Sequence, residues 1–132
     1  LSSKWEDEGT RTFLGIHTRG FPNLFLIAGP QGGGGSFNFT DAIDEHAEYI
    51  VWLLKTMKEN GKNRVDVLEE PEAEYTEHCR MADLGTRPLR DCVSYYNGHG
   101  DAQPGSLAYY GGGQWHKFRR RAQETLEPFI FA

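Results

Sequence analysis

Asp44, His46 and Glu48 stand close together in the sequence, and two carboxylates beside an imidazole are the residue types that general acid–base catalysis requires. Their spacing is not that of a His-Glu-x-x-His metal site, and they occur within a segment that carries a helical apolar stripe. Asp44 and Glu48 are four residues apart and therefore lie on one helix face. The pattern favours a solvated helix face over a catalytic centre.

His78 and Cys79 are a second candidate, because a thiol and an imidazole can form a nucleophile–base pair. Neighbouring residues on a helix point about 100° apart, so these two side chains cannot pair with each other. Cys79 is therefore expected in the core. His17 precedes a turn at Gly20, and a histidine in a connecting loop is expected to be solvated. We assign no chemistry to it.

The third candidate is a glycine-rich loop at residues 31–38, in which residues 32–36 are all small. Without side chains, its backbone can approach a ligand closely. The loop follows an apolar run at 24–28 that predicts a strand buried on both faces and ended by Gly29 and Pro30. In α/β proteins, ligands bind beyond the carboxyl ends of strands, so this loop is a candidate binding site. Two alternatives are a flexible linker and a loop that only turns.

The neighbouring segments predict the elements that would position this loop. Residues 13–16 predict a brief strand, and residues 1–10 a loop or short helical turn. After the loop, apolar residues recur at helical spacing, with Thr40 or Asp41 as the N-cap and Asn60 beginning the stop. The apolar stripe consists of Ile43, Ala47, Ile50, Leu54 and Met57.

Residues beyond position 62 predict shorter elements. These are a strand at 63–68, a helix from Pro71, a hairpin of aromatic strands at 93–96 and 106–110, a helix at 114–125 and a strand at 129–131. In the helix from Pro71, Tyr75, Cys79 and Ala82 are expected to share one side.

Composition restricts the class of protein. The 132 residues suffice for one domain with a core but are few for an enzyme with two cofactors. A net charge of −5 gives no reason to expect nucleic acid binding, and the basic cluster at 117–121 predicts a solvated helix face. No apolar run reaches the roughly 20 residues of a membrane span, and the charged residues 4–8 are unlike a signal peptide. Cys79 and Cys92 fit a reduced, cytoplasmic protein.

Several motifs occur in register around the glycine-rich loop. They are Arg11-Thr12-Phe13-Leu14-Gly15, Gly20-Phe21-Pro22-Asn23-Leu24-Phe25, Gly29-Pro30, and the helix residues Ile43, His46, Glu48 and Tyr49. In this arrangement the sequence resembles the flavin-dependent Baeyer–Villiger monooxygenases, at the last strand of the flavin domain, the active-site loop and the following helix. The resemblance continues through Leu1, Lys4 and Trp5 and the runs 94–98 and 109–112, and is nearest to members acting on large cyclic or steroid-like ketones. Because the spacing is unbroken on both sides of the loop, the linker alternative is disfavoured.

The resemblance implies an oxidoreductase that uses FAD and NADPH to insert one oxygen atom from O2 beside a ketone carbonyl, giving an ester or lactone. It implies that Gly29 and Pro30 lie beside the flavin and that Asn38 and Phe39 approach its ring system. Tyr95 falls where most members carry a tryptophan that contacts NADP, which puts that contact in doubt.

On the same resemblance, Gly34, Gly35 and Ser36 lie on the bulge that lines the substrate pocket. Their missing side chains would leave room for a bulky ketone. The size of this pocket is a hypothesis, because a wall of glycine is also a mobile wall.

The sequence lacks motifs that a complete enzyme of this kind needs. It has no Gly-x-Gly-x-x-Gly after a strand, no Phe-x-Gly-x-x-x-His-x-x-x-Trp-Pro fingerprint, and no segment matching the one that supplies the family's essential arginine. Leu1 begins in the middle of a stretch that the resemblance treats as continuous. We therefore expect a fragment that is inactive by itself and needs the remainder of the enzyme chain.

The predicted fold class is α/β, or α+β for the fragment by itself. Residues 1–62 are predicted to be the end of an FAD-binding, Rossmann-like domain with the substrate loop and its helix, and residues 63–132 a carboxyl-terminal helix and hairpin region. A lone strand at 24–28 would expose unpaired edges, so the isolated chain is expected to form a homodimer or to swap this strand. The alternative function is a stand-alone or split-enzyme binding module that needs a partner chain.

Overall fold

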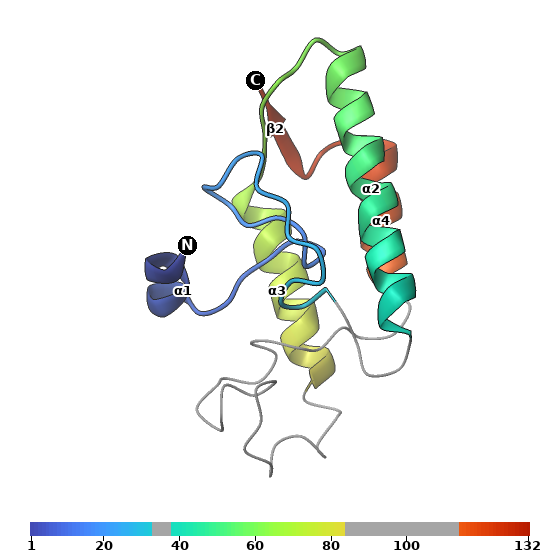
Figure 1. The fold of residues 1–132 in the computed structure, drawn as a ribbon. Helices are drawn as coiled ribbons and strands as arrows, with labels where there is room; N and C mark the ends of the chain where they lie inside the picture. Colours follow the sequence, from blue (N-terminus) through green and yellow to red (C-terminus); the bar gives the residue numbers. More distant parts are fainter. Residues whose placement is uncertain (33–37, 84–113) are drawn as a thin grey trace.

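The computed structural model describes residues 1–32, 38–83 and 114–132. In chain order the elements of these segments are α1 (Ser2–Glu8), α2 (Phe39–Glu59), β1 (Val65–Val67), α3 (Glu69–Asp83), α4 (Gln114–Thr125) and β2 (Phe129–Phe131) (Figure 1). The described chain is therefore mostly helical with a small two-stranded sheet, so the predicted α/β class appears here only in this coarse form. None of the described helices is both long enough and apolar enough to cross a membrane.

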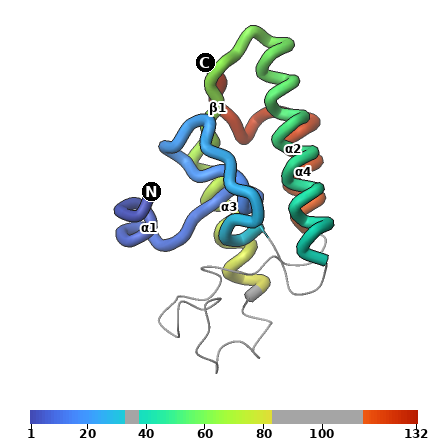
Figure 2. The backbone as a smooth tube through the Cα atoms, viewed as in Figure 1, coloured from blue at the N-terminus to red at the C-terminus, as the bar shows by residue number. Residues whose placement is uncertain are grey.

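Helices α2 and α4 pack against each other, and α3 lies on the other side of the irregular segment 10–32 (Figures 1 and 2). An ion pair between Arg119 of α4 and Glu48 of α2, with 3.6 Å between Nη2 and Oε2, joins the first two helices. β1 and β2 pair antiparallel, with Val65 opposite Phe131 and Val67 opposite Phe129. Segment 10–32 is thus held between helices from distant parts of the sequence.

The long helix α2 begins one residue after Asn38, whose side chain accepts a 3.1 Å hydrogen bond from the Thr40 backbone N–H. The N-cap predictions of Thr40 and Asp41 are therefore wrong, because Asn38 already satisfies the first free N–H groups. The stop is confirmed: Asn60 is the C-cap, and Gly61 has a φ of 63°.

The buried stripe of α2 differs from the predicted one. It consists of Ala42, His46, Tyr49, Leu53 and Met57, and of the predicted set only Met57 belongs to it. Leu54 is 47% exposed. The prediction counted aliphatic residues alone, whereas the structure buries a histidine and a tyrosine that make polar or ring contacts.

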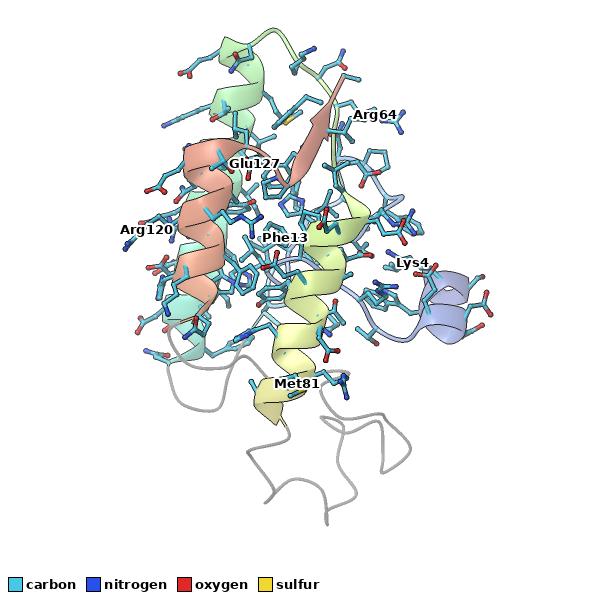
Figure 3. All side chains as sticks on the ribbon, turned by 180° about the vertical axis from the view of Figure 1, so that it is seen from behind. Lys4, Phe13, Arg64, Met81, Arg120 and Glu127 are labelled. Carbon is cyan, nitrogen blue, oxygen red and sulfur yellow. The ribbon has the colours of Figure 1, made fainter. Side chains whose placement is uncertain are left out.

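The core is built from aromatic rings, as the aromatic content predicts. Phe13 lies at its centre, between α3 and α4 (Figure 3). Its ring meets those of Tyr75, Phe118 and Phe129 edge to face, with centroids 5.9, 6.5 and 6.0 Å away. Such edge-to-face pairs stabilise by about 0.5–1.5 kcal/mol beyond the area that they bury. Cys79 is also buried, as predicted.

The apolar run at 24–28 is not a strand in this structure. Within the described segments it joins no ladder, and its backbone bonds include Leu26 N–H to the Ile16 carbonyl at 2.8 Å. A buried strand needs partners on both edges, and no described strand lies beside this run. Residues 13–16 are likewise a tight turn instead of a strand, with Leu14 and Gly15 at φ 61° and 70°.

The other predictions are largely confirmed. The strand predicted at 63–68 contains β1, the helix from Pro71 lies within α3, and α4 and β2 have the predicted bounds. The short helical turn expected at 1–10 is α1. The predicted hairpin at 93–96 and 106–110 lies outside the described residues.

Helix α1 has no buried residue of its own, and polar side-chain contacts fasten it to the body. Lys4 reaches α3 (Figure 3), where its Nζ lies 2.9 and 3.0 Å from the two carboxylate oxygens of Glu72. Glu72 is fully buried and also accepts a 2.7 Å hydrogen bond from the Arg19 backbone N–H. A buried carboxylate with a cation and a backbone donor is satisfied, so this pair fixes α1 and residue 19 to the start of α3.

Candidate functional site

Residues 28–32, called here the 28–32 turn, comprise the first two residues of the glycine-rich loop and the three residues before it. Gly32 N–H donates to the Gly29 carbonyl at 3.0 Å and closes the turn. Ala28 and Gln31 both have positive φ, at 54° and 64°. For residues other than glycine this left-handed conformation costs roughly 1–2 kcal/mol each, so the rest of the structure must hold the turn in place.

Gln31 holds the turn from inside. Its side chain is fully buried, and its Oε1 accepts from Thr12 Oγ1 at 2.7 Å and from Thr12 N–H at 3.1 Å. Its Nε2 donates to the Thr10 carbonyl at 3.1 Å, and the Thr12 hydroxyl proton is shared with the Pro30 carbonyl oxygen, which lies 3.1 Å from Thr12 Oγ1. The Gln31 side-chain amide thus makes the hydrogen bonds to the backbone of residues 10–12 that a neighbouring strand would otherwise make. Its bonds also join that segment to the turn.

Helix α3 supplies a second support. The Tyr75 hydroxyl donates to the Gln31 carbonyl at 2.7 Å, and both groups are buried. One residue further along, Thr76 Oγ1 donates to the Thr12 carbonyl at 3.3 Å. A buried hydrogen bond of this length has no water to replace it, so removing the hydroxyl would leave a carbonyl unsatisfied.

Helix α2 supplies the third support through His46. Its ring is 1% exposed, and its Nδ1 accepts a 3.2 Å hydrogen bond from the Ala28 backbone N–H. Burial lowers the pKa of His46, and a hydrogen bond to the Gly32 backbone opposes that shift. The ring therefore contacts the turn at both its first and its last residue.

Glycine is required where two backbones meet. A Cβ on Gly15 would lie 2.1 Å from the Gly32 Cα, and a Cβ on Gly32 would lie 2.7 Å from the His46 Cε1. No side chain fits at either position, and Gly15 also has a φ of 70°. The tight turn at 13–17 and the 28–32 turn are thus pressed together with nothing between them.

The predicted cofactor residues fall into two places. Gly29 and Pro30 are half-buried within the 28–32 turn, and the Gly29 N–H makes no hydrogen bond to another described residue. Asn38 and Phe39 are exposed at the start of α2, where Asn38 acts as the cap and Phe39 is 61% exposed. Tyr95 and the predicted substrate residues Gly34, Gly35 and Ser36 lie outside the described residues.

The remaining candidates do not form a catalytic group. His17, predicted to be solvated, is 3% exposed, and the rings of Phe25, Tyr49 and Phe129 lie 5.5, 5.7 and 5.3 Å from it. The prediction was wrong because aromatic residues distant in sequence close over the loop. Burial lowers the pKa of His17 to about 3, so the imidazole is neutral at physiological pH.

Burial likewise raises the pKa of the Cys79 thiol to about 12, which makes it unreactive. Within the described segments no three His, Cys, Asp or Glu side chains are placed to hold a metal ion. The pair of carboxylates suggested by Asp44 and Glu48 is a solvated face, on which Glu48 meets Arg119. Arg119 itself is half-buried, so the basic cluster is only partly the solvated face that was predicted.

None of the sequence patterns identified the supports of the turn, namely Gln31, His46 and Tyr75, as residues that hold it. One signal was present. His46 lies four residues after Ala42 and three before Tyr49, so a stripe begun at Ala42 would have placed a polar ring among buried positions. Gln31 and Tyr75 gave no comparable pattern.

Comparison with known proteins relates the chain to flavin enzymes. No family model matches it. It is 32% identical over 117 residues to the Baeyer–Villiger monooxygenase peniC of Penicillium patulum, a match that covers 83% of this chain and 19% of that protein. The chain spans about a fifth of the length of the curated relatives that it matches.

Solved structures give the same relationship. A crystal structure of OTEMO in complex with FAD and NADP matches 98% of this chain and 24% of its own, with a TM-score of 0.80 and 25% identity. An oxidised steroid monooxygenase bound to NADP matches with a TM-score of 0.81 and 24% identity, over 99% of this chain and 24% of its own. The second likeness is one of fold.

Proposed function

The chain is homologous to the carboxyl-terminal part of the Baeyer–Villiger monooxygenases, and we propose that it does the work of that part within a longer FAD- and NADPH-dependent enzyme. The enzyme would insert one oxygen atom from O2 beside a ketone carbonyl and release an ester or lactone. The observation that carries the proposal is the similarity over 98% of the chain to a structure holding both cofactors. In this proposal residues 1–62 complete the FAD-binding domain, and residues 63–132 form the region that follows it.

The 28–32 turn fits the edge of a flavin ring. Gly29 is half-buried, and its N–H is a backbone donor without a partner in the described segments. A Cβ at this position would lie 2.5 Å from the Gly15 carbonyl oxygen, so only glycine fits where the two turns meet. Flavin, when bound, supplies the oxygen-transfer chemistry. In the proposal, Gly29 and Pro30 lie against the ring and Asn38 and Phe39 border it. The exposed Phe39 side chain would help to exclude water.

Three further assignments belong to the proposal and lie outside the described residues. Gly34, Gly35 and Ser36 would line the ketone pocket, and Tyr95 would contact NADP. The phosphate groups of both cofactors would be held elsewhere in the longer enzyme, because this sequence has no Gly-x-Gly-x-x-Gly after a strand. By the same reasoning the chain alone would not turn over.

The first experiment uses the native polypeptide that carries this sequence, purified from its source. Its intact mass is expected to be several times 15.0 kDa. The enzyme should consume NADPH only when a cyclic ketone is present, and mass spectrometry should find a product heavier than the ketone by one oxygen atom. NADPH oxidation that does not depend on ketone, with no such product, would contradict the proposal. A mass near 15.0 kDa would favour the partner-dependent module.

A substitution tests the substrate assignment separately. Gly34→Leu in the complete enzyme should lower kcat/KM for a large cyclic ketone about tenfold or more and leave cyclopentanone nearly unchanged, because the new side chain fills the pocket. Leu68→Ala, at a position that is 41% exposed, serves as the control. Equal losses with both ketones would mean that the loop does not set substrate size.

A further inference from the structure

We propose that His46 and Trp115 are positioning residues that set the flavin-facing edge of the 28–32 turn, so that the distant helix α4 controls the geometry of the cofactor site. The inference rests on the proposed function for its catalytic consequence. Its structural half concerns only described residues.

His46 is the direct contact. It accepts the Ala28 N–H at Nδ1, and the position that a Gly32 Cβ would take lies 2.7 Å from its Cε1. As the acceptor of this bond, Nδ1 carries no proton, so the proton of the neutral ring lies on the opposite nitrogen. The ring spans the turn on the side opposite to Tyr75, which holds the Gln31 carbonyl.

Trp115 fixes His46. The two rings are stacked, with centroids 5.5 Å apart and planes inclined by 20°. The Trp115 indole N–H donates to the Leu14 carbonyl at 3.0 Å, in the tight turn whose Gly15 abuts Gly32. The indole therefore contacts the site by two routes: it supports the ring of His46 and it holds the opposing turn.

Arg119 locks the indole to α2. Its guanidinium lies 5.5 Å from the centre of the Trp115 ring, and it pairs with both Glu45 and Glu48. Glu45 immediately precedes His46 in the chain. Trp115 and Arg119 of α4 thus contact α2 at His46 and at the residues beside it.

The 28–32 turn needs these contacts because its own residues do not favour its backbone conformation. Ala28 has a φ of 54°, which an alanine rarely adopts, and among the described residues the Ala28 N–H finds its acceptor in His46. Gly29, the next residue, is the one proposed to face the flavin. A change in the hydrogen bond of Ala28 would therefore shift Gly29 and alter its contact with the flavin ring.

Two substitutions separate the hydrogen bond from the stack. His46→Phe keeps a flat ring against Trp115 but has no acceptor, and His46→Gln keeps an acceptor and a donor but no ring. His116→Phe is the matched control, since His116 is exposed and meets Trp115 only by its ring edge. All three are made in the complete enzyme, and amide hydrogen exchange is followed at Ala28 and, for comparison, at Val65–Val67.

In His46→Phe, the Ala28 amide should exchange about tenfold faster than in the unmodified enzyme while the β1 amides keep their rates. His46→Gln keeps the acceptor but loses the stack on Trp115, so Ala28 exchange should fall only part of the way back, to within about threefold of the unmodified enzyme, and His116→Phe should change nothing. The visible circular dichroism of bound FAD should change in His46→Phe and recover only in part in His46→Gln. Full recovery in His46→Gln would mean that the stack on Trp115 does not position the turn. The fraction of consumed NADPH that ends in ester should follow the same order.

Unchanged Ala28 exchange in His46→Phe would overturn the inference, as would an equal acceleration at Ala28 and in β1. Faster exchange at Ala28 with an unchanged flavin spectrum and unchanged ester yield would show that His46 positions the turn but does not affect the flavin or the reaction. Failure of the unmodified enzyme to form any ester would instead refute the proposed function, and the exchange measurements would still decide whether His46 positions the turn.

Discussion

The aromatic core and the 28–32 turn lie side by side but are held in different ways. The core consists of rings such as Phe13, Phe118 and Phe129, which pack edge to face and bury apolar area. The turn has left-handed residues held by directional hydrogen bonds from Gln31, Tyr75 and His46. The two regions should therefore respond to substitution in different quantities: the core in global stability, the turn in local geometry.

Tyr75 belongs to both regions. Its ring packs edge to face on Phe13 and Phe118, and its hydroxyl donates to the Gln31 carbonyl in the turn. Burial of the ring and satisfaction of the hydroxyl are separate energetic contributions. One residue thus joins the stable core to the strained backbone.

The largest effect is expected in the core. Phe13→Ala should reduce the free energy of unfolding by about 3–5 kcal/mol, because it removes the ring on which three others pack. Met81→Ala, at a position that is 55% exposed, should stay within about 0.5 kcal/mol. Urea denaturation measures both, and similar values for the two would remove the distinction between core and surface.

The next effect tests the close backbone approach. Gly15→Ala and Gly61→Ala both place a side chain at positive φ, but only the first meets another backbone, at 2.1 Å. Gly61→Ala should cost about 1–2 kcal/mol from conformation alone. Gly15→Ala should cost about 1–3 kcal/mol more, because the two turns must separate. Equal losses in urea denaturation would mean that the approach of Gly15 to Gly32 does not stabilise the fold.

A third effect depends on pH. The pKa of buried His17 is about 3, against 6.5 for an exposed histidine, so between these values the unfolded chain binds a proton that the folded chain does not. Stability contributed by neutral His17 is therefore complete above pH 6.5 and is lost as the pH falls towards 3, with a slope of at most about 1.4 kcal/mol per pH unit. His17→Phe should flatten the plot of unfolding free energy against pH from 6 to 4. An unaltered slope would mean that a group other than His17 binds the proton on unfolding.

The smallest effect separates the two contributions of Tyr75. Tyr75→Phe keeps the ring in the core and removes the bond to the Gln31 carbonyl, which should cost about 1 kcal/mol of unfolding free energy. Amide exchange should accelerate within residues 28–32 and not in β1. A loss as large as that of Phe13→Ala would show that the hydroxyl, and not the ring, secures the core.

Local sequence signals were reliable for helix α4, which satisfies its own backbone, and for strand β2, whose partner β1 lies within another predicted strand. Cys79 is buried as predicted. Two predictions failed because they depended on neighbours. The run at 24–28 has the composition of a buried strand but no described partner, and His17 is covered by rings from α2 and β2.

Gly29 and Pro30, which the sequence assigned to a cofactor site, lie in the 28–32 turn, and their contact with flavin stays a prediction. No sequence pattern indicated that His46 and Tyr75 support the turn. His46 is 18 positions along the chain from Ala28, and Tyr75 is 44 positions from Gln31. No periodicity within one element encodes such a bond.

The sequence by itself determined the helices, the apolar residues available for a core and the relationship to flavin monooxygenases, because these follow from short-range spacing and from motifs in register. Only the tertiary structure decided that Ala28 and Gln31 adopt left-handed backbone and that His46, Tyr75 and Trp115 hold them there. The physical reason is that a strained turn has no favourable local signal. Its conformation is stable only once helices from the rest of the chain supply the hydrogen bonds that it lacks.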